Sequence, residues 1–164
     1  MHRRFHLDVE ISAPLTAVKE RIAELRDDMP SHDRFAIETS LRHSHSDSRR
    51  IVEDFVVRDR IGRKPIAITF DYHTRVTLDL TSGSVTYDTY LPAGVHMLTR
   101  QAIEPHNGRV RIRETIDVTA PLPLLWIVYS GVTTAQRYLL ACVQAELEAQ
   151  HAPLPDYPDS RPAG

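Results

Sequence analysis

Glu114 is the residue of this chain that is best placed for acid–base chemistry. It lies between Ile112 and Ile116 in a run of alternating apolar residues, so a strand would point all three toward the core. A buried carboxylate without a partner is costly and tends to keep its proton. We therefore expect Glu114 either to bond an arginine or the backbone near a sheet end, or to act as a general acid or base. It is the best candidate for a catalytic residue.

Other polar side chains interrupt apolar faces in the same way. Gln101 stands within an alternating run, and Gln136 falls near the middle of the apolar arc of the last predicted helix. Tyr72 and Tyr87 can orient a ligand hydroxyl or carbonyl, although tyrosines at such positions also serve as packing residues with one satisfied hydroxyl. These four side chains are candidates for orienting a ligand.

Histidines near the middle of the chain raise the alternative of a metal site. His43 and His45 would point the same way on a strand, and His96, Glu104 or His106 could supply further ligands. The stretch is rich in serine, it borders a turn, and no third ligand is anchored beside it. Solvated loop histidines are the simpler interpretation, so we expect neither a metal nor a cofactor.

These candidates fall on a series of predicted strands. An alternating run covers about residues 5–11, and the same period of two returns from Phe35 to Thr119 with turn signals in between. The Asn107-Gly108 pair is one such signal and is typical of a hairpin. Counting the first run, the pattern predicts about seven strands, and their short connections predict antiparallel neighbours.

Two amphipathic segments frame the strands. Leu15, Val18 and Ile22 repeat at helical spacing directly after Pro14, which is tolerated in a first helical turn. A short second helix or a turn is predicted at 31–34. The segment 124–150 predicts a helix roughly 40 Å long, enough to cross a whole sheet. The fold expected is α+β, with a curved seven-stranded antiparallel sheet wrapped around the long C-terminal helix and one or two short helices after the first strand.

Composition and charge indicate one soluble domain. Hydrophobic residues make up 41% and charged residues 26%, and the formal net charge of −2 gives no electrostatic case for nucleic acid or an acidic membrane as main partner. Cys142 is the only cysteine, which favours a reducing, cytoplasmic compartment, and we expect it to pack in the core. Residues 1–150 are predicted to form the domain, and the proline-rich residues 151–164 a disordered tail.

The start of the chain resembles the START/SRPBCC superfamily, whose helix-grip fold is shared by pollen allergens, lipid-transfer domains and polyketide cyclases. The resemblance is carried by residues 9–18, Val-Glu-Ile-Ser-Ala-Pro-Leu-Thr-Ala-Val, and the order of elements extends it from about 4 to 150. The chain departs from the family at Lys19, where many members have an aromatic residue, and around Phe35, where a tryptophan often stands. The departures leave the subfamily open. We expect a bacterial protein of this superfamily.

The resemblance implies a deep apolar cavity between the sheet and the long helix. The alternative is that the same side chains fill a solid core. Predicted ligand-binding residues lie on the apolar side of a strand or of the last helix. They are Phe35, Ile37, Phe55, Phe70, Tyr72, Tyr87, Met97, Thr99, Gln101, Glu114, Ile116, Leu125, Tyr129, Val132, Gln136 and Leu139.

Three functions are consistent with this sequence, because a fold of this kind does not name its activity. The first is binding of a small hydrophobic molecule, such as a lipid, a polyketide or an aromatic metabolite, in the cavity. The second is a polyketide cyclase, aromatase or dehydratase with Glu114 or a tyrosine as general acid or base. The third is an interaction module that docks a partner, a second copy in a homodimer, or a membrane through the apolar segment 124–129.

Overall fold

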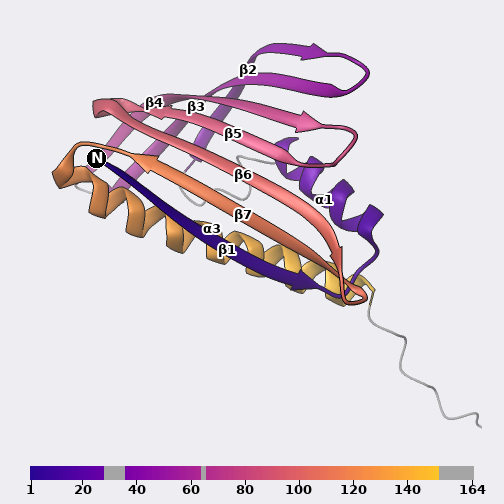
Figure 1. The fold of residues 1–164 in the computed structure, drawn as a ribbon. Coiled ribbons are helices and arrows are strands. Elements are labelled where there is room, and N and C mark those ends of the chain that lie inside the picture. The colour runs from indigo at the N-terminus through magenta and orange to yellow at the C-terminus, as the bar shows by residue number, and fades with distance from the viewer. Residues whose placement is uncertain (28–35, 64–65, 152–164) are drawn as a thin grey trace, which may run out of the picture.

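Seven strands form one antiparallel sheet of order β1-β7-β6-β5-β4-β3-β2 in the computed structural model, which describes residues 1–27, 36–63 and 66–151 (Figure 1). The strands are β1 (His2–Ile11), β2 (Ala36–Ser46), β3 (Arg50–Arg63), β4 (Ile66–Asp79), β5 (Val85–Leu91), β6 (Val95–His106) and β7 (Arg109–Thr119). The helices are α1 (Leu15–Asp27), the short 3-10 helix η1 (Pro92–Gly94) and α3 (Leu122–Gln150). The predicted α+β architecture is confirmed. The helix predicted at 31–34 and residues 152–164 of the predicted tail lie outside the described residues.

The connection between β1 and α1 follows from its proline. Pro14 needs no N–H in a helical first turn, and its carbonyl oxygen accepts the first helical hydrogen bond from the Val18 N–H at 3.1 Å. Val18 and Ile22 are buried on one side of α1, which packs against β6. The helix therefore closes one end of the curved sheet.

The long helix α3 lies along the sheet beside β1 and β7 (Figure 1). It begins two residues earlier than predicted because Pro123 fits within the first helical turn. The Phe5 and Tyr129 rings meet edge to face with their centroids 5.0 Å apart, and Gln144 Nε2 donates a 3.0 Å hydrogen bond to the Glu10 carbonyl oxygen. These two contacts show that α3 runs in the same direction as β1.

The strand register defines which side chains face α3. Phe5 is paired with Ile116, Ile116 with Thr99 and Thr99 with Tyr87, so these four share one side of the sheet. Because Phe5 contacts Tyr129 of α3, we call this side the inner face. The inner face carries the apolar alternation of the strands.

The opposite, outer face of the sheet is charged and is joined by ion pairs. Asp117 is the most enclosed of its acids, and it accepts hydrogen bonds from Arg4 at 2.7 Å and from Arg100 at 3.0 Å, with His2 Nε2 at 2.9 Å. The hydrogen bond from Arg4 is the main cause that lowers the pKa of Asp117 to about 2. The cluster ties β1, β7 and β6 together on the side away from α3.

Within the described ranges, no helix combines the length and the apolar character that crossing a lipid bilayer requires.

Candidate functional site

Glu114 lies in the middle of β7 on the inner face, and its side chain is 0% exposed. Its neighbours across the sheet are Leu7 on β1 and Gln101 on β6, both uncharged. Gln101 Nε2 donates a 3.2 Å hydrogen bond to Glu114 Oε1. Burial raises the pKa of Glu114 to about 7, and the hydrogen bond from Gln101 offsets part of that rise. Near neutral pH the carboxyl is therefore divided between its protonated and ionised forms.

Three buried side-chain oxygens at this level accept no hydrogen bond from any described group. They are Glu114 Oε2, Gln101 Oε1 and Gln136 Oε1. Gln136 stands about midway along α3 between Tyr129, which contacts Phe5, and Gln144, which bonds to Glu10. It is therefore level with Leu7 of β1. Leu7 is paired with Glu114 on β7, and Glu114 is paired with Gln101 on β6. We call Gln101, Glu114 and Gln136 the polar layer.

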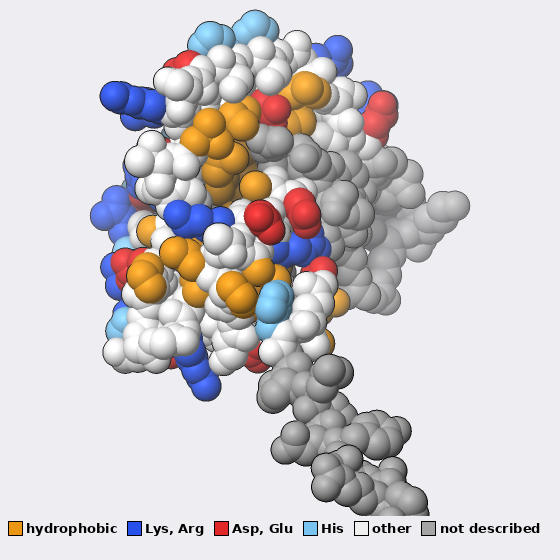
Figure 2. Space-filling view, turned by 90° about the vertical axis from the view of Figure 1, so that its right-hand side faces the viewer, with side chains coloured by type: hydrophobic (Ala, Val, Ile, Leu, Met, Phe, Trp, Pro, Cys, Tyr) orange, Lys and Arg blue, Asp and Glu red, His pale blue; other side chains and the backbone are white. Residues whose placement is uncertain are grey.

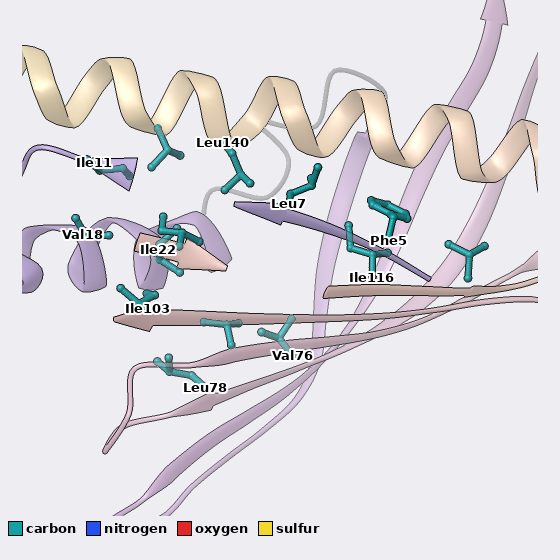
Figure 3. Packing of buried hydrophobic residues seen from close by; sticks show 14 of the residues in the cluster. Phe5, Leu7, Ile11, Val18, Ile22, Val76, Leu78, Ile103, Ile116 and Leu140 are labelled. Carbon is teal, nitrogen blue, oxygen red and sulfur yellow. The ribbon is translucent and has the colours of Figure 1, made fainter. Parts of the chain in front are cut away.

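On the α1 side of the polar layer the interior is filled with side chains. Ile11, Val18, Ile22, Ile112 and Leu140 are each at most 1% exposed. Figure 3 shows Ile11, Val18, Ile22 and Leu140 gathered where α1 and the end of β1 approach α3. We call these five residues the closed half, and no ligand can enter it without displacing them.

On the other side of the polar layer the inner face is partly open to solvent. Tyr72, Tyr87 and Met97 stand on central strands and face inward, yet they are only partly buried. Tyr129 and Val132 on α3 are partly buried as well. The reason is that α3 packs against β1, β7 and α1 and does not cover β3, β4 and β5 in the same way. We call these five residues the open half.

Two surface pockets can be described from their lining residues, and neither contains the polar layer. One, of about 360 Å³, lies over the charged residues Asp54, Arg75 and Asp88 on the outer face. The other, of about 410 Å³, lies between the Pro14 turn and the β6–β7 turn. Figure 2 shows this end of the molecule, where apolar side chains reach the surface among charged groups. Neither of the two is the enclosed cavity expected between the sheet and α3, where the described side chains form a filled half and a partly open half.

Three solved structures show how the architecture compares with known proteins. The Zhui aromatase/cyclase from Streptomyces sp. R1128 aligns with a TM-score of 0.68 at 16% identity, covering 92% of this chain and 96% of its own. Ara h 8.0201 aligns with a TM-score of 0.67 at 10% identity, covering 91% and 99%. Norcoclaurine synthase from Thalictrum flavum, in complex with dopamine and hydroxybenzaldehyde, aligns with a TM-score of 0.63 at 17% identity, covering 94% and 90%.

The chain has the helix-grip fold that the resemblance to the START/SRPBCC superfamily predicted. No protein-family model and no curated protein sequence matches it. At these identities the likeness establishes the fold and leaves the activity to be argued from the site.

The helix-grip structure places the predicted ligand-binding residues in two groups. Those that are buried are Phe55, Thr99, Gln101, Glu114, Ile116 and Leu125. Those that are partly exposed are Phe70, Tyr72, Tyr87, Met97, Tyr129, Val132, Gln136 and Leu139. Phe35 and the side chain of Ile37 lie outside the described residues. The structure brings Gln101, Glu114 and Gln136 to one level.

The sequence interpretation missed two features of the helix-grip interior. Leu140 is buried, while its neighbour Leu139 is only partly so. The spacing of Leu140 with the buried residues Val143 and Leu147 was the available signal. Thr74 and Thr89 also form a buried hydroxyl pair on the inner face, with their Oγ1 atoms 3.1 Å apart.

The metal alternative has no geometric support in the helix-grip sheet. His43 and His45 are exposed on β2, at one edge of the sheet. Strands β3, β4 and β5 separate them from β6, which carries His96, Glu104 and His106. Among the described residues, no group of three potential ligands could hold a metal ion.

The outer side of α3 is exposed and largely apolar near its start. Trp126 is 56% exposed and Ile127 is 70% exposed. The Arg3 guanidinium lies over the Trp126 ring, 3.8 Å from its centroid. Cys142, further along the same helix, is exposed, so the prediction that it packs in the core is wrong.

Proposed function

We propose that this helix-grip protein binds a small apolar molecule against the open half of its inner face. The observation that carries the proposal is the partial exposure of Tyr87 and Met97, which lie on central strands and face inward. A ligand covering such surface gains roughly 25 cal/mol for each Å² of apolar area removed from water. The few polar groups beside it would fix its orientation.

The chemistry of the similar proteins supports an aromatic or polyketide-like ligand over a lipid. One of them is an aromatase/cyclase by name, and another was solved with dopamine and hydroxybenzaldehyde, which are both aromatic. Tyr72, Tyr87 and Tyr129 in the open half offer ring surfaces on which a flat ligand can stack.

Filling the open half with a larger side chain is expected to abolish binding. Met97→Trp and Val132→Trp each place an indole where the ligand would lie, so both should weaken binding of an apolar fluorescent probe by about tenfold or more, equivalent to about 1.4 kcal/mol. Ala102→Trp is the matched control, because Ala102 is on the same strand as Met97 but is exposed on the outer face. Fluorescence titration of the three variants measures the affinity for the probe. Separately, native mass spectrometry of the wild-type protein as purified would identify a retained ligand. Equal affinity in all three would contradict the proposal.

A second candidate function is cyclase or aromatase chemistry on a polyketide in the same place. It is favoured by the pKa of Glu114, which burial raises to about 7, because a general acid or base works best when its pKa is near the working pH. Glu114→Gln is then expected to retain probe binding and to lower turnover of a poly-β-ketone by about 100-fold or more. Turnover that is unchanged in this variant would leave binding as the function.

A further inference from the structure

We propose that the polar layer binds a hydroxyl group of the ligand, so that the ligand class is a hydroxylated aromatic molecule. The inference rests on the proposed function, because it concerns the molecule that occupies the open half. It specifies which chemical group of that molecule the protein recognises. It also specifies which end of the molecule carries this group.

The Gln101–Glu114 hydrogen bond determines which atoms are left for a ligand. Because Gln101 Nε2 points at the carboxyl of Glu114, its amide oxygen must point away from it. When Glu114 is ionised, the reverse orientation would bring an amide oxygen against a carboxylate oxygen, which repel each other. Gln101 Oε1 and Glu114 Oε2 are therefore the acceptor atoms that this pair leaves unused, and both are buried without a hydrogen bond from the described residues.

Gln136 adds an acceptor from the opposite wall. Its Oε1 is also buried without a hydrogen-bond donor in the described structure, and α3 holds it level with Glu114. Native proteins rarely leave such groups unsatisfied, and a bound molecule or an ordered water accounts for the exceptions. When Glu114 is ionised, these three acceptors at one level call for a group that donates hydrogen bonds.

A hydroxyl fits this layer better than a carbonyl or an ammonium group. A carbonyl donates nothing and would set an oxygen against the amide oxygens of Gln101 and Gln136. An ammonium would pair with ionised Glu114, but the walls here include Leu7, Ile112 and Ile116, so the cost of removing both charges from water offsets the gain from pairing. A hydroxyl donates one hydrogen bond, accepts another and carries no charge.

The position of the polar layer places the hydroxyl at the leading end of the ligand. The closed half beyond it is filled by side chains such as Ile11 and Ile22. A ligand entering from the open half must therefore stop at the layer, with its apolar body against Tyr87 and Met97. Its hydroxyl then meets Glu114.

The test compares 2-naphthol with 2-methoxynaphthalene, which has the same rings but no donor. At pH 8, where Glu114 is mostly ionised, we expect 2-naphthol to bind the wild-type protein about tenfold more tightly by calorimetry, as for a hydrogen bond to a charged group. Glu114→Leu should reduce this ratio to about one. Glu104→Gln is the control, because Glu104 lies on the outer face of β6 and pairs with Arg113. The wild-type ratio should also fall when the pH is lowered to 5, a measurement that needs no variant.

The outcomes separate the two proposals. A ratio that collapses in Glu114→Leu and persists in Glu104→Gln supports the inference. A ratio near one in the wild type at pH 8, with both compounds bound and displaced by the apolar probe, overturns the inference and leaves ligand binding in place. No binding of either compound to the wild type overturns both. Should Glu114→Leu not fold, the wild-type pH series alone decides, and a ratio that does not change with pH counts against the inference.

Discussion

We expect Glu114→Gln to have a higher free energy of unfolding than the wild type at pH 8. This difference between variant and wild type should be about 3 kcal/mol larger at pH 8 than at pH 4.5. In the unfolded chain the carboxyl titrates with its ordinary pKa of 4.5, whereas burial raises the pKa to about 7 in the folded protein. Between these pH values the folded protein holds a proton that the unfolded chain has released, so raising the pH favours unfolding of the wild type. The difference of about 2.5 pKa units corresponds to about 3 kcal/mol. Glutamine does not titrate and does not incur this loss.

Urea denaturation of both proteins between pH 4.5 and 8 measures this effect. The stability difference should grow up to about pH 7 and stay level above it, since the folded carboxyl is then ionised. Glu104→Gln again serves as the control, because Glu104 is more exposed and bonds Arg113. A Glu114→Gln difference that is the same at every pH would mean that Glu114 is hydrated in solution.

Truncating Ile112 should cost far more than truncating Met97, although both face α3 from neighbouring strands. Ile112 is 0% exposed and is paired with Val9 and Ile103, so Ile112→Ala leaves a cavity in the closed half and should lower the free energy of unfolding by about 3–4 kcal/mol. Met97 is only partly buried, and solvent can occupy the space of its side chain. We therefore expect Met97→Ala to cost about 1 kcal/mol or less.

Chemical denaturation of the two alanine variants at one pH provides this comparison. The two positions are matched, because β6 and β7 are neighbours and both residues lie on the inner face. Equal losses of about 3 kcal/mol would show that the interior is packed to the same density on both sides of the polar layer. The open half would then not exist in solution.

The strands and helices could be predicted because their signals are local. Alternation identified the inward residues of β7. Pro123 lies in the first turn of α3, where a proline is compatible with a helix. The exposure of Cys142 was mispredicted because it depends on which side of α3 packs against β1 and β7, and a helix pattern alone does not give the angle of docking.

One part of the site was readable from the sequence and was overlooked. Gln101 lies six residues before Asn107, and Glu114 lies six residues after Gly108. A hairpin centred on Asn107-Gly108 therefore pairs them, as the register shows. The level of Gln136 was not readable, because it depends on how far α3 has advanced along β1, which is set by contacts between distant parts of the chain.

The ring of Trp126, the only tryptophan in the sequence, lies under the Arg3 guanidinium on the outside of α3. Tyr129, one helical turn further on, turns its ring toward Phe5 and the interior. The fluorescence of Trp126 therefore reports on the outer surface of this helix. It is a signal separate from changes at the inner face of the sheet.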